Sequence, residues 1–321
     1  MLNESLLKTA LMGDCSPEHI AALTPLQAIS WAPLKDRGIH LSVKREDLIH
    51  PGVSGNKLYK LFHHLQFARQ QGVERLVSFG GAYSNHLHAL AISGQLLGIE
   101  TVAVIRGERP PQLSATLIDC EANGMQLKFV SRQEYKRRHD DDYLAMLKRQ
   151  YGSCHIVPEG GGGTLGAQGC SAIARAINDA VDRPVDSICT ACGTGTTLAG
   201  LIVEAEPATE VIGIAVLKAA PAISQEATEL VAQLTHKPSS NWRVESRFHG
   251  GGYAKLPEEL KRFIVEFEEQ TLIPLDPIYT VKLFWGIKSL AEQGYWPKGS
   301  HVVAIHTGGL QGRRGFNGIW Q

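Results

Sequence analysis

The sequence predicts an α/β protein with mainly parallel sheets. Three observations support this: short runs rich in β-branched residues recur along the chain, amphipathic segments separate them, and glycine clusters follow several of them. The runs interpreted as buried strands are "RLVSF" (75–79), "ETVAVI" (100–105), "QLKFV" (126–130), "HIVPE" (155–159), "SICTA" (187–191), "EVIGIAV" (210–216) and "HVVAIH" (301–306). Because helical patterns alternate with these runs, helices should cover both faces of each sheet.

Composition narrows the class of function. A chain of 321 residues allows one large or two ordinary domains. Its 32 basic and 32 acidic side chains cancel, which favours a small substrate over nucleic acid or a membrane surface. The first twenty residues lack a secretion core and no run of 18 apolar residues follows, so we expect a cytoplasmic protein. The close pair Cys189 and Cys192 has no second pair of metal ligands, so we expect buried thiols and no metal.

Glycines gather in four clusters, and each cluster follows a predicted strand. They are "FGGAYSN" (79–85), "PEGGGGTLG" (158–166), "ACGTGTTLAG" (191–200) and "HTGGLQG" (306–312). Ligands of open α/β sheets bind at the carboxyl ends of the strands, where backbone amides and helix N-termini converge. Any single cluster is explained equally well by a tight turn. The four together predict one shared ligand site.

The cluster at 191–200 predicts a phosphate site. A strand runs into five small residues, and a helix is expected to begin at about Leu198. The five are Gly193, Thr194, Gly195, Thr196 and Thr197. Their N–H groups and three hydroxyls can surround an anion at the positive end of the helix. No Gly-Lys-Ser/Thr follows as in a nucleoside-triphosphate loop, and the dinucleotide fingerprint is absent.

The stretch "SGNKLYK" (54–60) places two lysines at a predicted helix start. Ser54 or Asn56 is expected to cap a helix whose apolar stripe comprises Leu58, Leu61, Leu65 and Ala68. Lys57 then lies in the first turn, and its pKa should be lowered if it is partly buried, as an imine-forming amine requires. Lys60 could remain charged and pair with a phosphate. The alternative is two solvated helix lysines.

The stretch "SFGGAYSNHLHAL" (78–90) supplies a second anion site. Gly80 and Gly81 end a strand, and Ser84, Asn85 and His86 open the next helix. Their free backbone N–H groups suit a carboxylate. The alternative is that Ser84 is an ordinary N-cap.

The motifs "SGNKLYK", "GGAYSNH", "GGGGTLGAQG", "ACGTGTTLAG", "LDPIYT" and "IHTGG", in this order, resemble those of pyridoxal-phosphate (PLP) enzymes with the tryptophan-synthase-β-like fold. The branch that matches best holds 1-aminocyclopropane-1-carboxylate (ACC) deaminase and D-cysteine desulfhydrase, and the likeness runs from about 24 to 309. It implies two open, mainly parallel twisted sheets flanked by helices (fold type II), with the active site in the interdomain cleft. It also implies a large domain of residues 1–59 and 159–321, a small domain of 60–158, a small amino-acid substrate and a homodimer.

The resemblance also implies roles for single residues. Lys57 would bind the PLP aldehyde as an imine, Asn85 would contact the ring hydroxyl, and Ser84, Asn85 and His86 would hold the substrate carboxylate. Gly193 to Thr197 and Lys60 would hold the phosphate. Lys57, Ser84, Tyr279 in "LDPIYT" and Tyr253 in "HGGGYAK" would be catalytic, although Tyr253 matches only by its position between a strand and a helix.

Two positions separate the branches of this family. ACC deaminases resemble one another in a glutamate that follows the tyrosine of "LDPxY" and faces the pyridine nitrogen, whereas this chain has Thr280. It also has Thr307, which resembles D-cysteine desulfhydrase, where a threonine hydroxyl meets that nitrogen. A neutral hydroxyl makes the ring a weaker electron sink, which loss of a thiolate tolerates better than opening of a cyclopropane.

We therefore expect a lyase that converts D-cysteine to pyruvate, ammonia and sulfide. The alternatives are an ACC deaminase, formally a hydrolase that gives 2-oxobutyrate and ammonia, and a non-catalytic protein that binds PLP or another small molecule. A nicotinamide-dependent oxidoreductase would need an acidic residue after a fingerprint; Glu210 is the candidate, but the glycine pattern is missing.

Two segments depart from the family pattern. Leu58 and Tyr59 stand where the family has a polar residue and arginine, and bulky side chains follow Thr280. These are Val281, Leu283, Phe284 and Trp285. Their periodicity favours a helix core, and the alternative is that some of them line and reshape the pocket.

Overall fold

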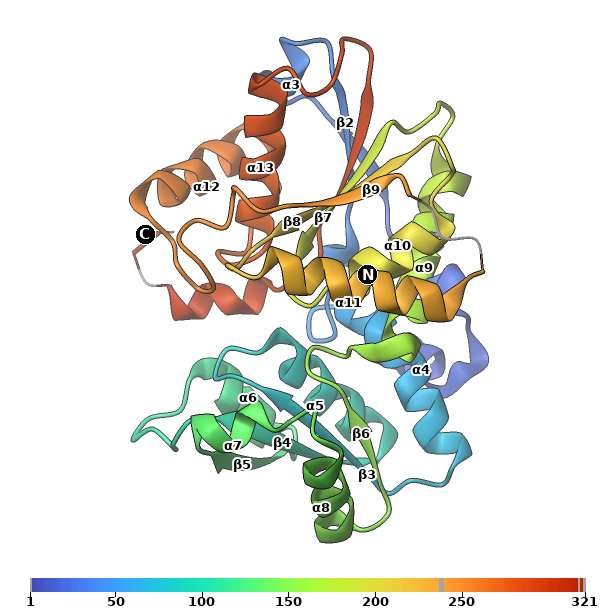
Figure 1. Cartoon of the computed structure of the whole chain (residues 1–321), viewed down its shortest axis with the longest axis vertical. Coiled ribbons are helices and arrows are strands. Elements are labelled where there is room, and N and C mark those ends of the chain that lie inside the picture. The colour runs from blue at the N-terminus through green and yellow to red at the C-terminus, as the bar shows by residue number, and fades with distance from the viewer. Residues whose placement is uncertain (1, 237–239, 317, 320–321) are drawn as a thin grey trace.

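The computed structural model describes residues 2–236, 240–316 and 318–319. Two open sheets form two lobes, shown one above the other in Figure 1. The larger sheet has the strand order β1-β2-β10-β7-β8-β9 and the smaller has β5-β4-β3-β6. All neighbouring strands are parallel except β1 and β2. The predicted fold class is confirmed.

The strands are β1 (Leu26–Ile29), β2 (His40–Lys44), β3 (Arg75–Gly80), β4 (Glu100–Arg106), β5 (Gln126–Val130), β6 (Cys154–Val157), β7 (Ser187–Cys192), β8 (Glu210–Ala215), β9 (Trp242–Glu245) and β10 (His301–Ile305). The α-helices are α1 (Glu4–Thr9), α2 (Pro17–Ala22), α3 (Ala32–Lys35), α4 (Asn56–Gln70), α5 (Asn85–Leu97), α6 (Ala115–Ala122), α7 (Arg132–Lys136), α8 (Asp141–Tyr151), α9 (Gly163–Ala180), α10 (Thr196–Glu204), α11 (Ala220–Leu234), α12 (Glu258–Thr271) and α13 (Thr280–Glu292). Short π and 3-10 segments lie at Ala10–Asp14, Glu46–Leu48 and Leu310–Gly315.

All seven predicted strands form, and three further strands were not predicted. β1 and β9 lie at the edges of the larger sheet, where half-buried side chains weaken the apolar pattern. β2 contains a buried lysine, which hides it from a hydropathy reading. The Nζ of Lys44 donates to the carbonyl oxygens of Ala21 and Thr24, both at 2.6 Å, so its burial is compensated.

The side chains of successive strand residues pack into cores on opposite faces of the sheet, because side-chain direction alternates along a strand. In β10, Val303 and Ile305 pack with α9, α10 and α11, whereas Val302 and Ala304 pack with α3, α12 and α13. The smaller sheet is covered by α7 and α8 on one face and by α5 and α6 on the other. The larger sheet is therefore sandwiched between helices, and its carboxyl ends face the other lobe.

Helix α4 begins differently from the prediction. Its apolar stripe is fully buried as expected, but neither Ser54 nor Asn56 caps it. The N-cap is Gly55, with a positive φ of 65°. A Cβ at this position would lie 1.9 Å from the carbonyl oxygen of Thr307, so only glycine lets the start of α4 approach the end of β10 this closely.

The strands of the smaller sheet all fall within residues 75–157, inside the predicted small domain of 60–158. The predicted boundary between 59 and 60 falls within α4, so we propose that α4 belongs to the junction of the two domains. None of the described helices is long and apolar enough to cross a membrane.

Candidate active site

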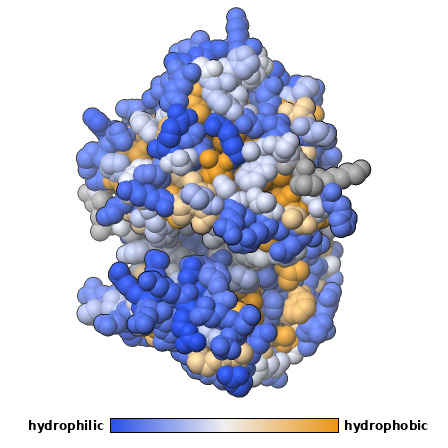
Figure 2. All heavy atoms as spheres, in the orientation of Figure 1, coloured by the Kyte–Doolittle hydropathy of each residue, from blue (hydrophilic) through white to orange (hydrophobic). Residues whose placement is uncertain are grey.

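A cleft of about 690 Å³ opens between the two lobes and is visible as a hollow in Figure 2. This volume suits a small organic ligand. Every site residue predicted from the sequence lines it. These are Lys57, Lys60, Ser84, Asn85, His86, Gly193, Thr194, Gly195, Thr196, Thr197, Tyr253, Tyr279 and Thr307. The fold thus gathers them at one place, and their individual roles stay predictions.

Lys57 lies at the second position of α4, and its amine reaches deep into the cleft although the whole side chain is only half-buried. Its Nζ donates to Oδ1 of Asn56 at 2.6 Å and lies 6.0 Å from the centre of the Tyr279 ring. Burial, and then the positive charge of Lys60, lower the pKa of Lys57 from its ordinary 10.5 to about 7. About half of the amine is therefore neutral and nucleophilic at pH 7, whereas an ordinary lysine is almost wholly protonated there.

The predicted phosphate site lies at the start of α10, which begins at Thr196 rather than at Leu198. The first N–H groups of the helix have no intrahelical acceptor and face the cleft. Hydroxyls gather beside them: Thr194 Oγ1 lies 3.0 Å from Thr196 Oγ1 and accepts from Lys60 Nζ at 3.3 Å. Burial lowers the pKa of Lys60, and a bound anion beside its amine would oppose that shift.

Gly195 cannot be replaced at the turn into α10. Its φ is 76°, in the left-handed region, and a Cβ would lie 2.8 Å from the carbonyl oxygen of Ile223. The close contact with α11 and the unusual backbone both require glycine. This is the physical reason for glycine at the centre of "GTGTT".

Ser84 is the N-cap of α5, which confirms the alternative reading of this residue. Its Oγ accepts from the N–H of Leu87 at 3.2 Å, so the hydroxyl is partly engaged. The N–H groups of Asn85 and His86 remain at the positive end of the helix and suit a carboxylate.

The His86 ring has a defined tautomer. Ser78 Oγ donates its proton to the Val157 carbonyl at 2.8 Å, so its 2.7 Å contact with His86 Nε2 requires that nitrogen to carry the hydrogen. His86 Nδ1 is then a buried acceptor that has no hydrogen-bond partner in the described part of the chain. Burial, and then the charge of Lys57, hold the pKa of His86 well below 6.5, so the ring stays neutral.

Asn85 is oriented by a residue that the sequence did not reveal. Gln311 Nε2 donates to Asn85 Oδ1 at 2.8 Å, which turns the Asn85 Nδ2 group into a free donor. Asn56 was also misjudged: it does not cap α4, but its Nδ2 donates to Thr197 Oγ1 at 2.8 Å and thereby ties the Lys57 helix to the phosphate loop.

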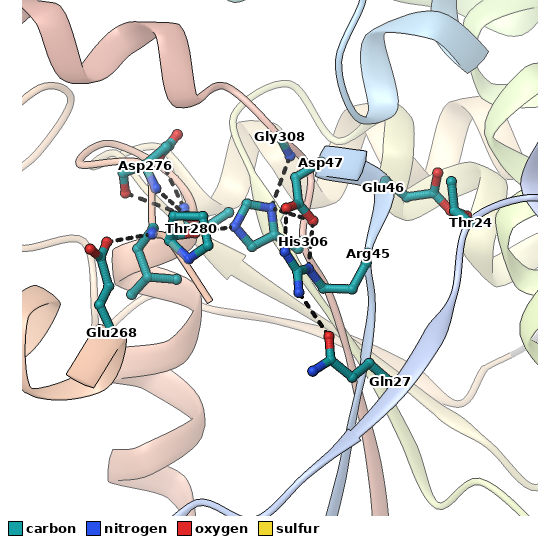
Figure 3. A network of polar contacts seen from close by, with 12 residues as sticks. Thr24, Gln27, Arg45, Glu46, Asp47, Glu268, Asp276, Thr280, His306 and Gly308 are labelled. Atoms are coloured by element: carbon teal, nitrogen blue, oxygen red, sulfur yellow. Dashed lines mark hydrogen bonds and ion pairs between the residues drawn. The ribbon is translucent and has the colours of Figure 1, made fainter. Parts of the chain in front are cut away.

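The loop that carries Thr307 is held in place by a buried network of His306, Asp47 and Arg45 (Figure 3). His306 Nε2 contacts the carbonyl oxygen of Pro274 at 2.6 Å, and His306 Nδ1 lies 3.3 Å from Asp47 Oδ1. Arg45 holds Asp47 through two hydrogen bonds of 2.9 and 2.7 Å. This buried scaffold fixes the backbone of Thr307 at the cleft wall.

Thr280 does not face the cleft. It is fully buried, and its Oγ1 accepts from the N–H of Asp276 at 2.7 Å, which fixes the start of α13 (Figure 3). Asp276 Oδ1 in turn accepts from the N–H groups of Ile278 and Thr280 at 2.9 and 3.1 Å. Of the two threonines considered for the pyridine nitrogen, Thr307 lines the cleft and Thr280 does not.

Two tyrosines form the wall opposite the smaller sheet. The rings of Tyr253 and Tyr279 lie 6.5 Å apart with an interplanar angle of 71°. Tyr253 lies between β9 and α12, and the residue is 41% exposed, although burial of its hydroxyl raises its pKa. Burial raises the pKa of Tyr279 well above 10, so its phenol stays protonated.

The side chains that depart from the family pattern lie outside the cleft. Phe284 is fully buried, with its ring 4.5 Å from that of Phe267, and the Trp285 ring lies 5.3 Å from that of Phe263. Leu58 and Tyr59 are likewise buried in the core behind Lys57. The interpretation as helix core is confirmed, and the pocket is not reshaped by these residues.

Sequence reasoning missed several charged residues that line the cleft. They are Arg106, Arg138, Glu159 and Glu226. Glu159 belongs to a glycine cluster, which was a signal for it, but Arg106 ends β4, Arg138 lies in the turn after α7 and Glu226 lies in α11, and none of these three belongs to a cluster. Only the fold brings them to the cleft.

Comparison with known proteins agrees with this geometry. The family model described as "Pyridoxal-phosphate dependent enzyme" matches residues 19–308. A putative ACC deaminase of Pyrococcus horikoshii is 27% identical, over 90% of each chain, and a D-cysteine desulfhydrase of Serratia proteamaculans is 28% identical, over 90% of this chain and 92% of its own. The crystal structure of an ACC deaminase homologue superposes with a TM-score of 0.81 at 25% identity, over 95% of each chain.

Proposed function

The chain belongs to the family of pyridoxal-phosphate-dependent enzymes, and from this premise we propose that it is a lyase that removes the β-substituent of D-cysteine, giving pyruvate, ammonia and sulfide. The observation that carries the proposal is the pairing of two features in one cleft. Lys57 presents an amine whose pKa is lowered to about 7, and the residue available to the pyridine nitrogen is the neutral Thr307 rather than a carboxylate.

The residues of the cleft fit PLP. The start of α10 and Lys60 supply donors for a phosphate, and Lys57 supplies the amine for an aldehyde. Asn85 offers a free Nδ2 donor for the ring hydroxyl because Gln311 occupies its Oδ1. When bound, PLP supplies an electron sink joined to the substrate amine.

The protein groups then divide the remaining work. The substrate carboxylate rests on the N–H groups of Asn85 and His86. Lys57, with its pKa of about 7, takes the α-proton, because an amine near its pKa is an efficient base at neutral pH. Tyr279 is unsuited to that step since its phenol holds its proton, and it serves as a hydrogen-bond donor instead.

ACC deaminase is the second candidate, because the relative from Pyrococcus horikoshii carries that name. Thr280 argues against this activity. It stands where the resemblance expects the glutamate of ACC deaminases, and its hydroxyl accepts from the backbone N–H of Asp276.

Two experiments test the proposal. Purified protein should be yellow, and borohydride should bleach it and leave the cofactor mass on Lys57, whereas Lys57→Ala should take up no reducible adduct. Lys136→Ala, at an exposed lysine of α7, is the control and should keep it. A 2-oxo acid and ammonia assay with D- and L-amino acids and ACC then identifies the substrate. Sulfide and pyruvate from D-cysteine support the proposal; 2-oxobutyrate from ACC would favour the second candidate.

We further propose that the chain is a cytoplasmic homodimer, on the family resemblance alone. Sedimentation of the holoenzyme at micromolar concentration should give twice the mass of the chain, 35.0 kDa. A monomer that turns over substrate would contradict this.

A further inference from the structure

Arg106 occupies a distinctive place in the cleft. It is the last residue of β4, an inner strand of the smaller sheet, and its exposed side chain lines the cleft. A Cβ on Gly81 would lie 3.6 Å from Nη2 of Arg106. The guanidinium therefore lies against the bare backbone of Gly81, three residues before the helix start that suits the substrate carboxylate.

Arg106 differs from the other cations of the cleft in having no polar partner. Among the described residues that line it, Lys57 donates to Asn56, Lys60 to Thr194, and Arg138 to Glu159. Within the same described ranges Arg106 makes no hydrogen bond or ion pair, and its Cζ lies 5.9 Å from the centre of the Tyr135 ring.

Neither nearby acid neutralises Arg106. Glu159 is the acid on the same side of the cleft, but Tyr135 OH donates to its Oε1 and Arg138 Nε to its Oε2, both at 2.7 Å. Glu226 lies toward the phosphate side, where its charge acts on Lys60. A guanidinium at the substrate side of the cleft is thus left with unused donors.

The position of Arg106 suits the side chain of a bound amino acid. Burial raises the pKa of Tyr253, the hydrogen bond with Tyr279 opposes the rise, and the positive charge of Arg106 opposes it further, so Arg106 lies within electrostatic range of that hydroxyl. The α-carboxylate already has donors at the start of α5. A second anionic group, on the side chain of the substrate, would bind Arg106.

We propose that Arg106 determines substrate specificity by binding the β-substituent of the amino acid. Its positive charge would stabilise the negative charge that this group carries as it leaves. The inference rests on the proposed function and names its substrate class: amino acids whose β-substituent is anionic or leaves as a basic anion. In the elimination, Lys57 takes the α-proton, the C–H electrons form the Cα=Cβ bond, and the electrons of the Cβ–S bond leave with sulfur as HS⁻ beside the guanidinium. ACC has no such group.

The experiment compares Arg106→Gln with wild-type holoenzyme on β-substituted alanines in both enantiomers. Cysteine, O-phosphoserine and cysteate have basic or anionic substituents, and β-chloroalanine is neutral and loses the weakly basic chloride. We expect kcat/KM to fall about 10- to 100-fold for the first three, as loss of a charged hydrogen bond predicts, and less than about 3-fold for β-chloroalanine. Arg109→Gln is the control: Arg109 is exposed, pairs with Glu121 at 3.0 Å and does not line the cleft, so it should behave as wild type.

Equal losses on every substrate, β-chloroalanine included, would overturn the proposal and assign Arg106 to the α-carboxylate or to the fold. No loss on any substrate would overturn it as well. If the wild-type holoenzyme turns over no amino acid, the proposed function fails separately, and the cofactor absorption band still reports binding. Aspartate should then perturb this band at about 10-fold lower concentration than alanine, and only while Arg106 is present; equal affinities would sink the inference.

Discussion

Removing the amine of Lys57 should stabilise the cofactor-free protein. In the folded apoprotein the pKa of Lys57 is about 7, compared with 10.5 for an ordinary lysine, because burial and Lys60 oppose its charge. The unfolded chain therefore binds a proton that the folded chain releases between these two values. The free energy of unfolding of the wild type should therefore rise with pH across the window from about 7 to 10.5. Below about pH 7 the destabilisation caused by the buried charge of Lys57 should be present in full.

The magnitude follows from the size of the shift. A difference between 10.5 and about 7 corresponds to at most about 5 kcal/mol at pH 6.5 and about 1.5 kcal/mol at pH 9.5. Water in the open cleft screens part of this, so we expect Lys57→Met to be about 2–4 kcal/mol more stable than wild type at pH 6.5 and less than about 1 kcal/mol more stable at pH 9.5. Methionine keeps the length and helix preference of the side chain.

Urea unfolding of the apoproteins at the two pH values measures this difference, with the cofactor first removed from both. Lys136→Met is the control: this lysine is exposed on α7, and its substitution should change stability equally at both pH values. A Lys57→Met variant that is no more stable than wild type at pH 6.5, or whose advantage does not shrink at pH 9.5, would refute the assignment of Lys57 as a buried amine with a strongly lowered pKa.

Three further outcomes follow from packing and hydrogen bonding. Gly55→Ala should lower the free energy of unfolding by more than about 3 kcal/mol in urea, because a Cβ would meet the Thr307 carbonyl at 1.9 Å, whereas Gly72→Ala, also at positive φ but with no atom within 4 Å, should cost only about 1 kcal/mol. Phe284→Ala should cost about 3–5 kcal/mol in urea unfolding yet leave KM unchanged, since the ring is core and not pocket; a changed KM would contradict this. Gln311→Leu removes the bond that orients a cofactor-facing amide and should weaken PLP binding about fivefold in equilibrium dialysis, while unaltered affinity would argue against that role.

The elements that sequence predicted best are those with a strong local signal. The central strands β7, β8 and β10 are continuous apolar runs, because both of their faces are covered by helices. The edge strands β1 and β9 have no such pattern, since most of their side chains are only partly buried. The start of α4 was misplaced for a different reason: its cap is a backbone turn at Gly55 that is stabilised by contact with β10, and no side chain signals it.

The fold class, the glycine loops, the two lysines and the threonine hydroxyls could be predicted from local patterns, because each depends on neighbours only a few residues apart. The chemical state of these groups depends on contacts between distant parts of the chain. The lowered pKa of Lys57 comes from burial and from the charge of Lys60, and the tautomer of His86 is set through Ser78. That Arg106 has no polar partner among the described residues is visible only once Glu159 is seen to bind Tyr135 and Arg138. The burial of Lys57, the tautomer of His86 and the unpaired charge of Arg106 all depend on residues that folding brings together from distant parts of the chain. Local sequence patterns do not report such contacts.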